Sequence, residues 1–371
     1  MGLMNFLIPF LILITIVVFI HEYGHYYFAK KYGVGVTDFS IGFGKEIFGW
    51  NDKSGTRWKV CWLPLGGYVK FFGDRNVFSQ SEQQELINQY SEEDRNKLFI
   101  LKPLYQRAII VAAGPLANFL LAILIFTFIN LFSGKDMTPA IIEEVQINTP
   151  AFKSGLKKND KILFINDNKV ESILEVSTFI NTSTSEKIEF KILRNNEELS
   201  IFVEPNLVDT KDAFGNAVKK RMIGIKLSVV ENQFKTQPLG PAKAIYYSFK
   251  EVWFVTTTSL NYIGKIITGS GDSSQLGGPV KIAKITGQVA EHGIVPFLSI
   301  MAYISISLGM INLFPIPMLD GGHLMFYFFE KILGKPLSQK TQENFFRIGL
   351  FLLFSLMFFV TYNDLRDLGL F

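Results

Sequence analysis

The chain has 371 residues, of which 48% are hydrophobic and 36 are phenylalanine, and its formal net charge is +4. Its mean hydropathy of +0.24 predicts a polytopic membrane protein with an additional soluble part. The small net charge gives no support to a nucleic-acid partner. The single cysteine, Cys61, excludes an intrachain disulfide and a multi-thiolate metal site.

The first predicted element is a membrane span from 4 to 28, within a first region at 1–33. The five N-terminal residues carry no Lys or Arg, so this segment is predicted to be a retained span rather than a cleaved signal peptide. Lys30 and Lys31 follow it and predict that this end is cytoplasmic.

A His-Glu-x-x-His motif closes this span. His21 and His25 are one helical turn apart, so both imidazoles can bind the same zinc ion, and Glu22 beside them can act as general base on a water molecule at the metal. The alternative is a pair of histidines that caps the span at the membrane interface. At about 1.5 Å per residue, His21 lies roughly 25 Å along the helix, near the cytoplasmic side of the membrane core.

Residues 34–106 are predicted to be a cytoplasmic loop that contains two short strands, 46–50 and 57–63, around a turn at 51–55. Two interpretations stay open for this hairpin. It can rest on the membrane surface as an amphipathic element, or it can expose a strand edge to an extended substrate. Residues 74–101 are predicted to be a polar loop with a short helix.

The second span is predicted at 108–132, within the region 107–132. Pro115 is expected to kink this span or to mark its entry. Asn118 is an amide in an apolar span, where a helix–helix hydrogen bond is commoner than a catalytic role.

Residues 133–240 are predicted to form a small α/β module with a strand at 161–165, a helix at 170–180 and a hairpin at 188–203. This module has no acid–base constellation and by itself resembles a binding module. Residues 241–295 are predicted to be an aromatic-rich amphipathic helix, 241–268, followed by a loop.

The third span is predicted at 296–313, within a region at 296–330, and the last span lies at 345–363. Two prolines break the third span before Asp320. This break exposes backbone polar groups, which at membrane depth are tolerated only inside the protein or against a cavity. A catalytic zinc takes three protein ligands, and the remaining candidates for the third are His292, Asp320, His323 and Glu330.

Asp320 is preferred as the third ligand because the Pro-broken, Gly-flanked segment can bring a short carboxylate close to the histidines. His323 is predicted either to support a ligand from outside the coordination sphere or to be a surface histidine. If 241–268 also crossed the membrane, Asp320 would emerge on the side opposite to the histidines. That helix is therefore predicted to lie in the outer interface without spanning.

Five segments together resemble the site-2 protease family, and closely its RseP-like bacterial branch. They lie in the family's order and are HEYGH at 21–25, GGYVKF at 66–71, RAIIVAAGPLANF at 107–119, GGPV at 277–280 and NLFPIPMLDGGH at 312–323. The resemblance implies an intramembrane zinc metalloprotease with four transmembrane helices, a membrane-reentrant β-loop and one inserted PDZ-like domain. The chain has room for one such domain where two are frequent, and Asn159 stands where glycine is usual.

The resemblance also implies the roles of individual residues. His21, His25 and Asp320 would be the zinc ligands, Glu22 the catalytic base and Asn312 a substrate-binding residue. The expected activity is endoproteolysis of single-span membrane substrates, of the anti-sigma factor or remnant signal peptide type, in the bacterial inner membrane. Lipid is an expected partner, as is a peptide ligand of the PDZ-like domain. The alternative function is a non-enzymatic, zinc-binding membrane scaffold.

Overall fold

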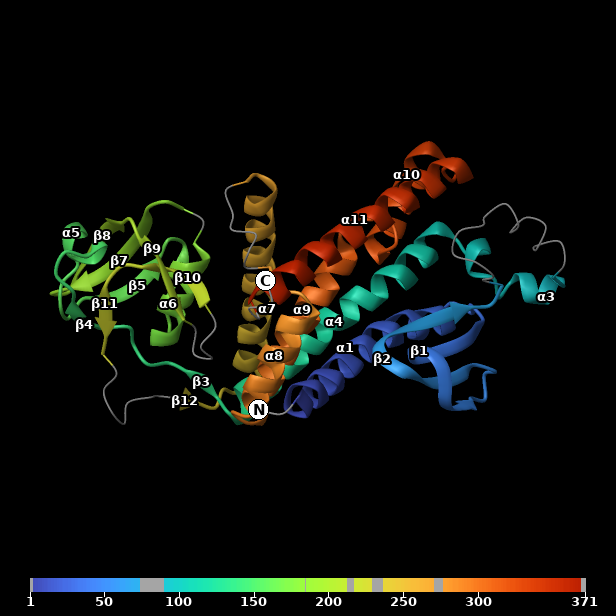
Figure 1. Cartoon of the computed structure of the whole chain (residues 1–371), viewed down its shortest axis with the longest axis horizontal. Helices are drawn as coiled ribbons and strands as arrows, with labels where there is room; N and C mark the ends of the chain where they lie inside the picture. The colour runs from blue at the N-terminus through green and yellow to red at the C-terminus, as the bar shows by residue number, and fades with distance from the viewer. Residues whose placement is uncertain are drawn as a thin grey trace. The chain divides into compact units, whose positions relative to one another are not determined.

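The structure is a computed structural model that describes residues 3–73, 90–183, 185–211, 217–228, 236–269 and 276–367. It divides into two compact units, which are described in turn (Figure 1). The first unit contains residues 1–125 and 276–369, and the second contains residues 126–275.

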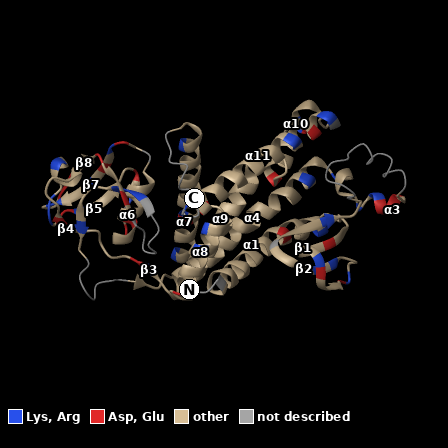
Figure 2. Cartoon of the chain, viewed as in Figure 1, with Lys and Arg blue, Asp and Glu red and all other residues tan. Residues whose placement is uncertain are grey.

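Within the described residues, four helices are long and apolar enough to cross a membrane. They are α1 (Leu3–Lys31), α4 (Leu104–Phe132), α9 (Ile294–Leu313) and α11 (Gln339–Asp367). These helices carry few charged side chains along most of their length (Figure 2), and many of their apolar side chains are exposed. A water-soluble protein would bury such surfaces, so the chain is a multi-pass membrane protein, as its sequence predicts.

The predicted hairpin is present, but its strands are longer than expected. Strand β1 (Val36–Asn51) pairs with β2 (Arg57–Phe71), and the predicted turn lies between them. Each strand folds back on itself, so that Phe39 has one partner in Val69 and another in Trp58. Trp58 is also paired with Trp50. The segment 57–61 is therefore interior to the sheet, whereas the segment 67–71 pairs on one side and forms an edge.

The hairpin turn is tied to helix α1 through Asp52. Burial alone would raise the pKa of this carboxyl, but hydrogen bonds from Ser54, Trp58, Thr56 and Tyr26 lower it well below its usual range. Tyr26 belongs to α1, and its hydroxyl donates to Asp52 over 2.9 Å. This contact sets the position of the hairpin relative to the helix that carries the histidine motif.

Helix α8 (Pro279–Ala290) corrects the prediction of a loop in this part of 241–295. Its N-terminus has Gly278 at the cap and proline in the first turn, a pattern typical of helix starts. Glycine has no side chain to cap the helix. The Asp364 carboxylate of α11 does so instead, by accepting hydrogen bonds from the backbone N–H groups of Gly278 over 2.8 Å and of Val280 over 3.0 Å. The local sequence thus indicates the start of the helix, whereas the carboxylate that caps it lies 83 to 86 residues away.

The remaining short elements of the first unit follow the predicted pattern only in part. The predicted loop 74–101 contains α3 (Glu92–Arg95) and the 3₁₀ helix η1 (Phe99–Leu101), while 74–89 lie outside the described residues. The predicted region 296–330 contains a second helix, α10 (Asp320–Leu333), because residues 314–319 are not helical.

The second unit contains an α/β module whose main sheet has the strand order β6-β5-β7-β8 and a hydrophobic core of its own. The predicted strand at 161–165 and the hairpin at 188–203 are both present. The module's elements are β3 (Lys135–Asp136), β4 (Ile142–Val145), α5 (Pro150–Ser154), β5 (Lys161–Ile165), β6 (Asn168–Lys169), α6 (Ile173–Thr182), β7 (Ile188–Arg194), β8 (Glu197–Val203), β9 (Asn206–Lys211), β10 (Ala217–Met222), β11 (Ile225–Leu227) and β12 (Thr236–Gln237).

Asn159, where the resemblance to the site-2 proteases leads us to expect glycine, adopts a left-handed backbone with φ of 71°. Asparagine tolerates this conformation better than most residues, so the replacement preserves the local fold. The next residue, Asp160, is fully buried and accepts two hydrogen bonds of 2.7 Å from the Arg194 guanidinium. The departure at position 159 is thus accommodated by the backbone.

Helix α7 (Pro241–Ile267) covers the predicted aromatic-rich segment as one helix. It contacts the α/β module through Phe254, whose ring lies 5.3 Å from that of Phe179. Another face of α7 exposes large side chains, among them Tyr246, Phe249 and Trp253. Helix α7 is not among the four candidate spans of the described chain.

Candidate metal centre

His21 and His25 project from one face of α1, as their spacing predicts. Their Nε2 atoms are 3.2 Å apart, and the two side chains are almost completely buried. Gly114 of α4 packs directly against both rings, and a Cβ atom at this position would collide with them. The close approach of α4 therefore requires glycine here, and it shapes the space around the two nitrogens.

Asp320 completes a three-residue cluster from the other end of the chain. Its Oδ2 atom lies 3.1 Å from His21 Nε2, and its Oδ1 atom lies 3.5 Å from His25 Nε2. The backbone turns into α10 through a tight turn closed by the Leu319 N–H and the Ile316 carbonyl. Gly322 lets this segment fold closely, since a Cβ there would lie 2.5 Å from the Ile316 carbonyl.

The geometry of the cluster fits a tetrahedral metal ion. Among the described residues, one ligand atom from each of His21, His25 and Asp320 lies within 4.8 Å of the other two. Bonds of about 2.0–2.1 Å at tetrahedral angles place neighbouring ligand atoms about 3.3–3.4 Å apart. The observed separations of 3.1, 3.2 and 3.5 Å agree with that spacing.

Each imidazole has a contact on its second nitrogen. His25 Nδ1 donates to the Ile110 carbonyl of α4 over 2.8 Å, which leaves the Nε2 lone pair for a metal. His21 Nδ1 lies 3.3 Å from the side-chain amide of Asn118, also of α4. Asn118 therefore contacts a proposed ligand on α1, and this contact is a helix–helix contact of the kind expected at this position.

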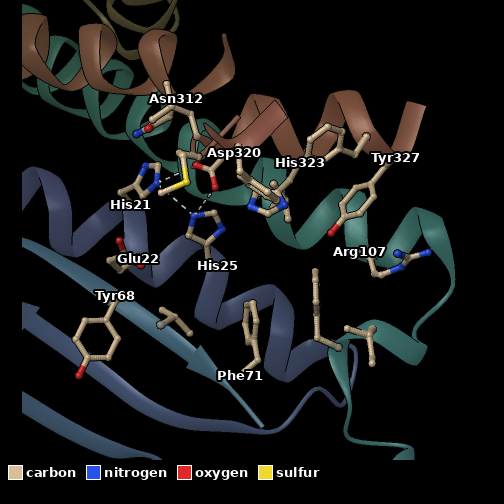
Figure 3. Close-up of a pocket in the computed structure, with 18 of the residues that line it drawn as sticks. His21, Glu22, His25, Tyr68, Phe71, Arg107, Asn312, Asp320, His323 and Tyr327 are labelled. Atoms are coloured by element: carbon tan, nitrogen blue, oxygen red, sulfur yellow. Dashed lines mark hydrogen bonds and ion pairs between the residues drawn. The ribbon is translucent and has the colours of Figure 1, made fainter. Parts of the chain in front are cut away.

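Glu22 lies beside the cluster, between α1 and the edge segment of β2 (Figure 3). Glu22 and Val69 of this edge segment both line the pocket. A Cβ atom on Gly67 would lie 3.2 Å from Glu22 Cγ, so the strand approaches the carboxylate closely. Helix α1 and the hairpin thus hold the carboxylate from two sides.

The cluster opens into a pocket of about 690 Å³. Its lining includes the three clustered residues, Glu22, the edge segment of β2, Asn312 of α9, and Met318. Figure 3 shows Asn312 on the side of the pocket formed by α9, close to His21 and Asp320. A peptide that enters this pocket would meet an apolar wall and a compact group of polar side chains.

Known proteins share the sequence of this chain over nearly its full length. A model of peptidase family M50 matches residues 9–356. The chain belongs to peptidase family M50. A relative named as a putative zinc metalloprotease of Agrobacterium fabrum is 40% identical over 366 residues, which cover 99% of this chain and 97% of the relative. Another putative zinc metalloprotease, of Mesorhizobium japonicum, is 39% identical over 363 residues, which cover 97% of this chain and 98% of the relative.

A third relative, metalloprotease MmpA of Caulobacter vibrioides, is 34% identical over 391 residues, covering 100% of this chain and 98% of the relative. The comparisons confirm the predicted family, and they confirm a zinc metalloprotease as the class of enzyme.

The other candidate ligands of this M50 peptidase lie apart from the cluster. His292 is exposed, and its Nδ1 donates to the Gln288 carbonyl over 2.9 Å. His323 lines the pocket but packs against the ring of Phe346 at 5.8 Å. Glu330 accepts two hydrogen bonds from the guanidinium of Arg107.

The sequence did not indicate that Gly114 packs on the histidines, and it left the role of Asn118 open. They lie four positions apart in α4, which places both on one face of this helix. The spacing is visible in the sequence, but nothing local indicates that this face packs on the histidines. Met318 was missed as well, and it adopts an unusual φ of 90° directly before Leu319 and Asp320.

Proposed function

We propose that the protein is an intramembrane zinc endopeptidase that cleaves single-span membrane substrates. The observation that carries the proposal is the convergence of His21, His25 and Asp320 beside Glu22, at a pocket whose histidines belong to a candidate membrane span. The donor set of two imidazoles and one carboxylate is typical of catalytic zinc sites, which keep a fourth position open.

Each residue of the site has a distinct task in the proposed reaction. Zinc, when bound, polarises the scissile carbonyl and lowers the pKa of water toward about 7. Glu22 takes the proton of the attacking water and passes it to the leaving amine. The buried site restricts bulk water, which strengthens the electrostatic interactions inside it. Asn312, at the pocket wall, would hold the unwound substrate or its oxyanion.

A helical substrate hides its peptide bonds, so it must unwind before cleavage. The segment 67–71 supports a route to unwinding, because it is an edge of the hairpin sheet and lines the pocket next to Glu22. An extended substrate would add to this edge through main-chain hydrogen bonds. Between the two interpretations of the hairpin, these contacts favour substrate pairing over a passive surface element.

Gly67→Ala tests this role of the hairpin. The new methyl group would lie 2.7 Å from the Ser40 carbonyl and 3.2 Å from Val18, so the edge must move away from Glu22. We expect cleavage to fall about 10- to 100-fold with zinc content unchanged, since small misplacements of a substrate carry costs of this size. Gly264→Ala is the matched control, because that glycine has no neighbour within 4 Å of its added Cβ. Equal activity of both variants would contradict substrate pairing at this edge.

The proposed location is the bacterial inner membrane, with the metal centre near the cytoplasmic face and the α/β module outside. Lys30 and Lys31 at the end of α1 support this orientation. If α1 and α4 both cross, α9 can bring Asp320 back to the histidines only when α7 does not cross. We therefore propose that α7 lies in the outer interface, with its exposed aromatic side chains toward lipid.

Cysteine labelling tests this topology in a Cys61→Ser background. Single cysteines at Gln237 and Thr268, which are exposed on either side of α7, should both react with a membrane-impermeant thiol reagent from outside intact cells. A cysteine at Lys335, after α10, should be protected until the membrane is opened. Labelling of positions 237 and 268 from opposite sides would contradict the topology and the assignment of Asp320 as a ligand.

The proposed substrates are single-span proteins of the anti-sigma factor or remnant signal peptide type, and the α/β module is proposed to be a PDZ-like domain that binds a peptide. The deciding experiment is cleavage of a model transmembrane peptide by the purified protein with its zinc content measured in parallel. Zinc binding without cleavage would instead favour the non-enzymatic scaffold.

A further inference from the structure

The side chain of Asn118 is fully buried, yet its amide has contacts on one side only. Its nitrogen position lies 3.3 Å from His21 Nδ1. Within the described residues, its Oδ1 atom has no hydrogen-bond partner. The contact with His21 joins α4 to α1, as amide side chains in membrane spans commonly do. The partner of the amide is the imidazole of a proposed metal ligand.

The packing of α4 against α9 does not depend on this amide. Ser305 of α9 donates to the backbone carbonyl of Asn118 over 2.9 Å. A Cβ atom at Gly309 would lie 2.9 Å from the Pro115 carbonyl, so the two backbones are in close contact. The Asn118 side chain is therefore available for a task at His21, and Ser305 offers a neighbouring contact that can be removed separately.

The tautomer of His21 decides whether it can bind a metal. If the amide nitrogen donates to Nδ1, the imidazole proton must sit on Nε2, the atom that faces Asp320 at 3.1 Å. A protonated Nε2 cannot coordinate an ion. The two ends of an asparagine amide have the same shape, and turning it by half a rotation presents Oδ1 to Nδ1–H instead. That arrangement leaves the Nε2 lone pair directed at the cluster.

We propose that Asn118 is a positioning residue that holds His21 in the Nδ1–H tautomer by accepting its hydrogen bond through Oδ1. This inference rests on the proposed zinc site and adds to it a residue outside the coordination sphere. The two histidines are then held in the same way by α4, His25 through the Ile110 carbonyl and His21 through the Asn118 amide. Partners of this kind typically contribute 10- to 100-fold to metal affinity.

The test measures zinc affinity of the full-length protein in detergent by competition with a chromogenic chelator. Asn118→Leu keeps the branched shape of the side chain but has no acceptor, and we expect zinc affinity to fall about 10- to 100-fold. Asn118→Asp restores an acceptor at the same distance, and its affinity should stay close to that of the unmodified protein. If Asn118→Leu does not fold, Asn118→Ala serves instead, with folding checked by thermal unfolding.

Ser305→Ala is the matched structural control. It removes a buried hydrogen bond from the same residue without altering the imidazole contact, so it should lower thermal stability and leave zinc affinity unchanged. Unchanged affinity in Asn118→Leu would overturn the inference. A similar loss in Ser305→Ala or in Asn118→Asp would overturn it too, because each would indicate a packing role.

His21→Ala separates this inference from the proposed function. If His21→Ala loses zinc while Asn118→Leu retains it, the positioning role alone fails. If His21→Ala retains zinc, the metal centre itself is wrong.

Discussion

Replacing Glu22 by glutamine is expected to abolish cleavage while zinc stays bound. Glutamine keeps the shape of the side chain and leaves His21, His25 and Asp320 unchanged, but it cannot take a proton from water. General acid–base groups contribute about 10²–10⁴-fold to rate, so turnover should fall by at least that range. The measurement combines cleavage of a model transmembrane peptide with metal analysis of the same preparation.

Glu46→Gln is the control for the loss of a carboxylate. Glu46 lies in the hairpin and pairs with Arg57 at the protein surface, away from the pocket lining. Its substitution should leave both zinc content and cleavage nearly unchanged. Substantial turnover by Glu22→Gln would remove Glu22 from the role of general base, and zinc loss would instead indicate that the carboxylate helps to hold the metal.

Replacing Asp320 by alanine is expected to weaken zinc binding by more than the 10- to 100-fold typical of residues outside the coordination sphere. Its two carboxylate oxygens face the Nε2 atoms of His21 and His25 at 3.1 and 3.5 Å. Two histidines alone provide too few ligands for the usual catalytic zinc site. Zinc retained after dialysis against a chelator is the measurement.

His323→Ala is the comparison for this variant, since His323 lies three residues further along α10 and lines the same pocket. We expect its effect on zinc retention to be small. Its ring packs against Phe346, and among the described residues the cluster that could hold a metal ion does not include it. If His323→Ala empties the site while Asp320→Ala does not, the third ligand has been assigned to the wrong residue.

The hairpin and helix α8 illustrate where prediction from the sequence ended. The turn at 51–55 was predictable because its residues interact locally, through hydrogen bonds from Ser54 and Thr56 to Asp52. The folding back of both strands depends on pairing between segments about 30 residues apart, and it decides which segment is an edge. Helix α8 begins with a local signal, Gly278 followed by Pro279, but the carboxylate that caps it belongs to the last helix.

The sequence by itself determined the four apolar spans, the two histidines and the adjacent glutamate. The spans follow from apolar composition over one membrane thickness, and the pairing of the two histidines follows from the helical period over one turn. The sequence favoured Asp320 as the third member because of its Pro-broken, Gly-flanked segment, but only the tertiary structure placed it, rather than the other three candidates, next to the histidines. The spatial order of the candidates depends on how the Pro-broken segment turns into α10.

The contacts that surround the ligands were also decided by tertiary structure. Gly114 and Asn118 share a face of α4, but their contact with the histidines exists only because α4 packs against α1. Close packing of two helices is set by side chains on both of them, and one helix alone does not reveal which face the other will meet. For this reason the residue types of the site were evident from the sequence, whereas their partners were not.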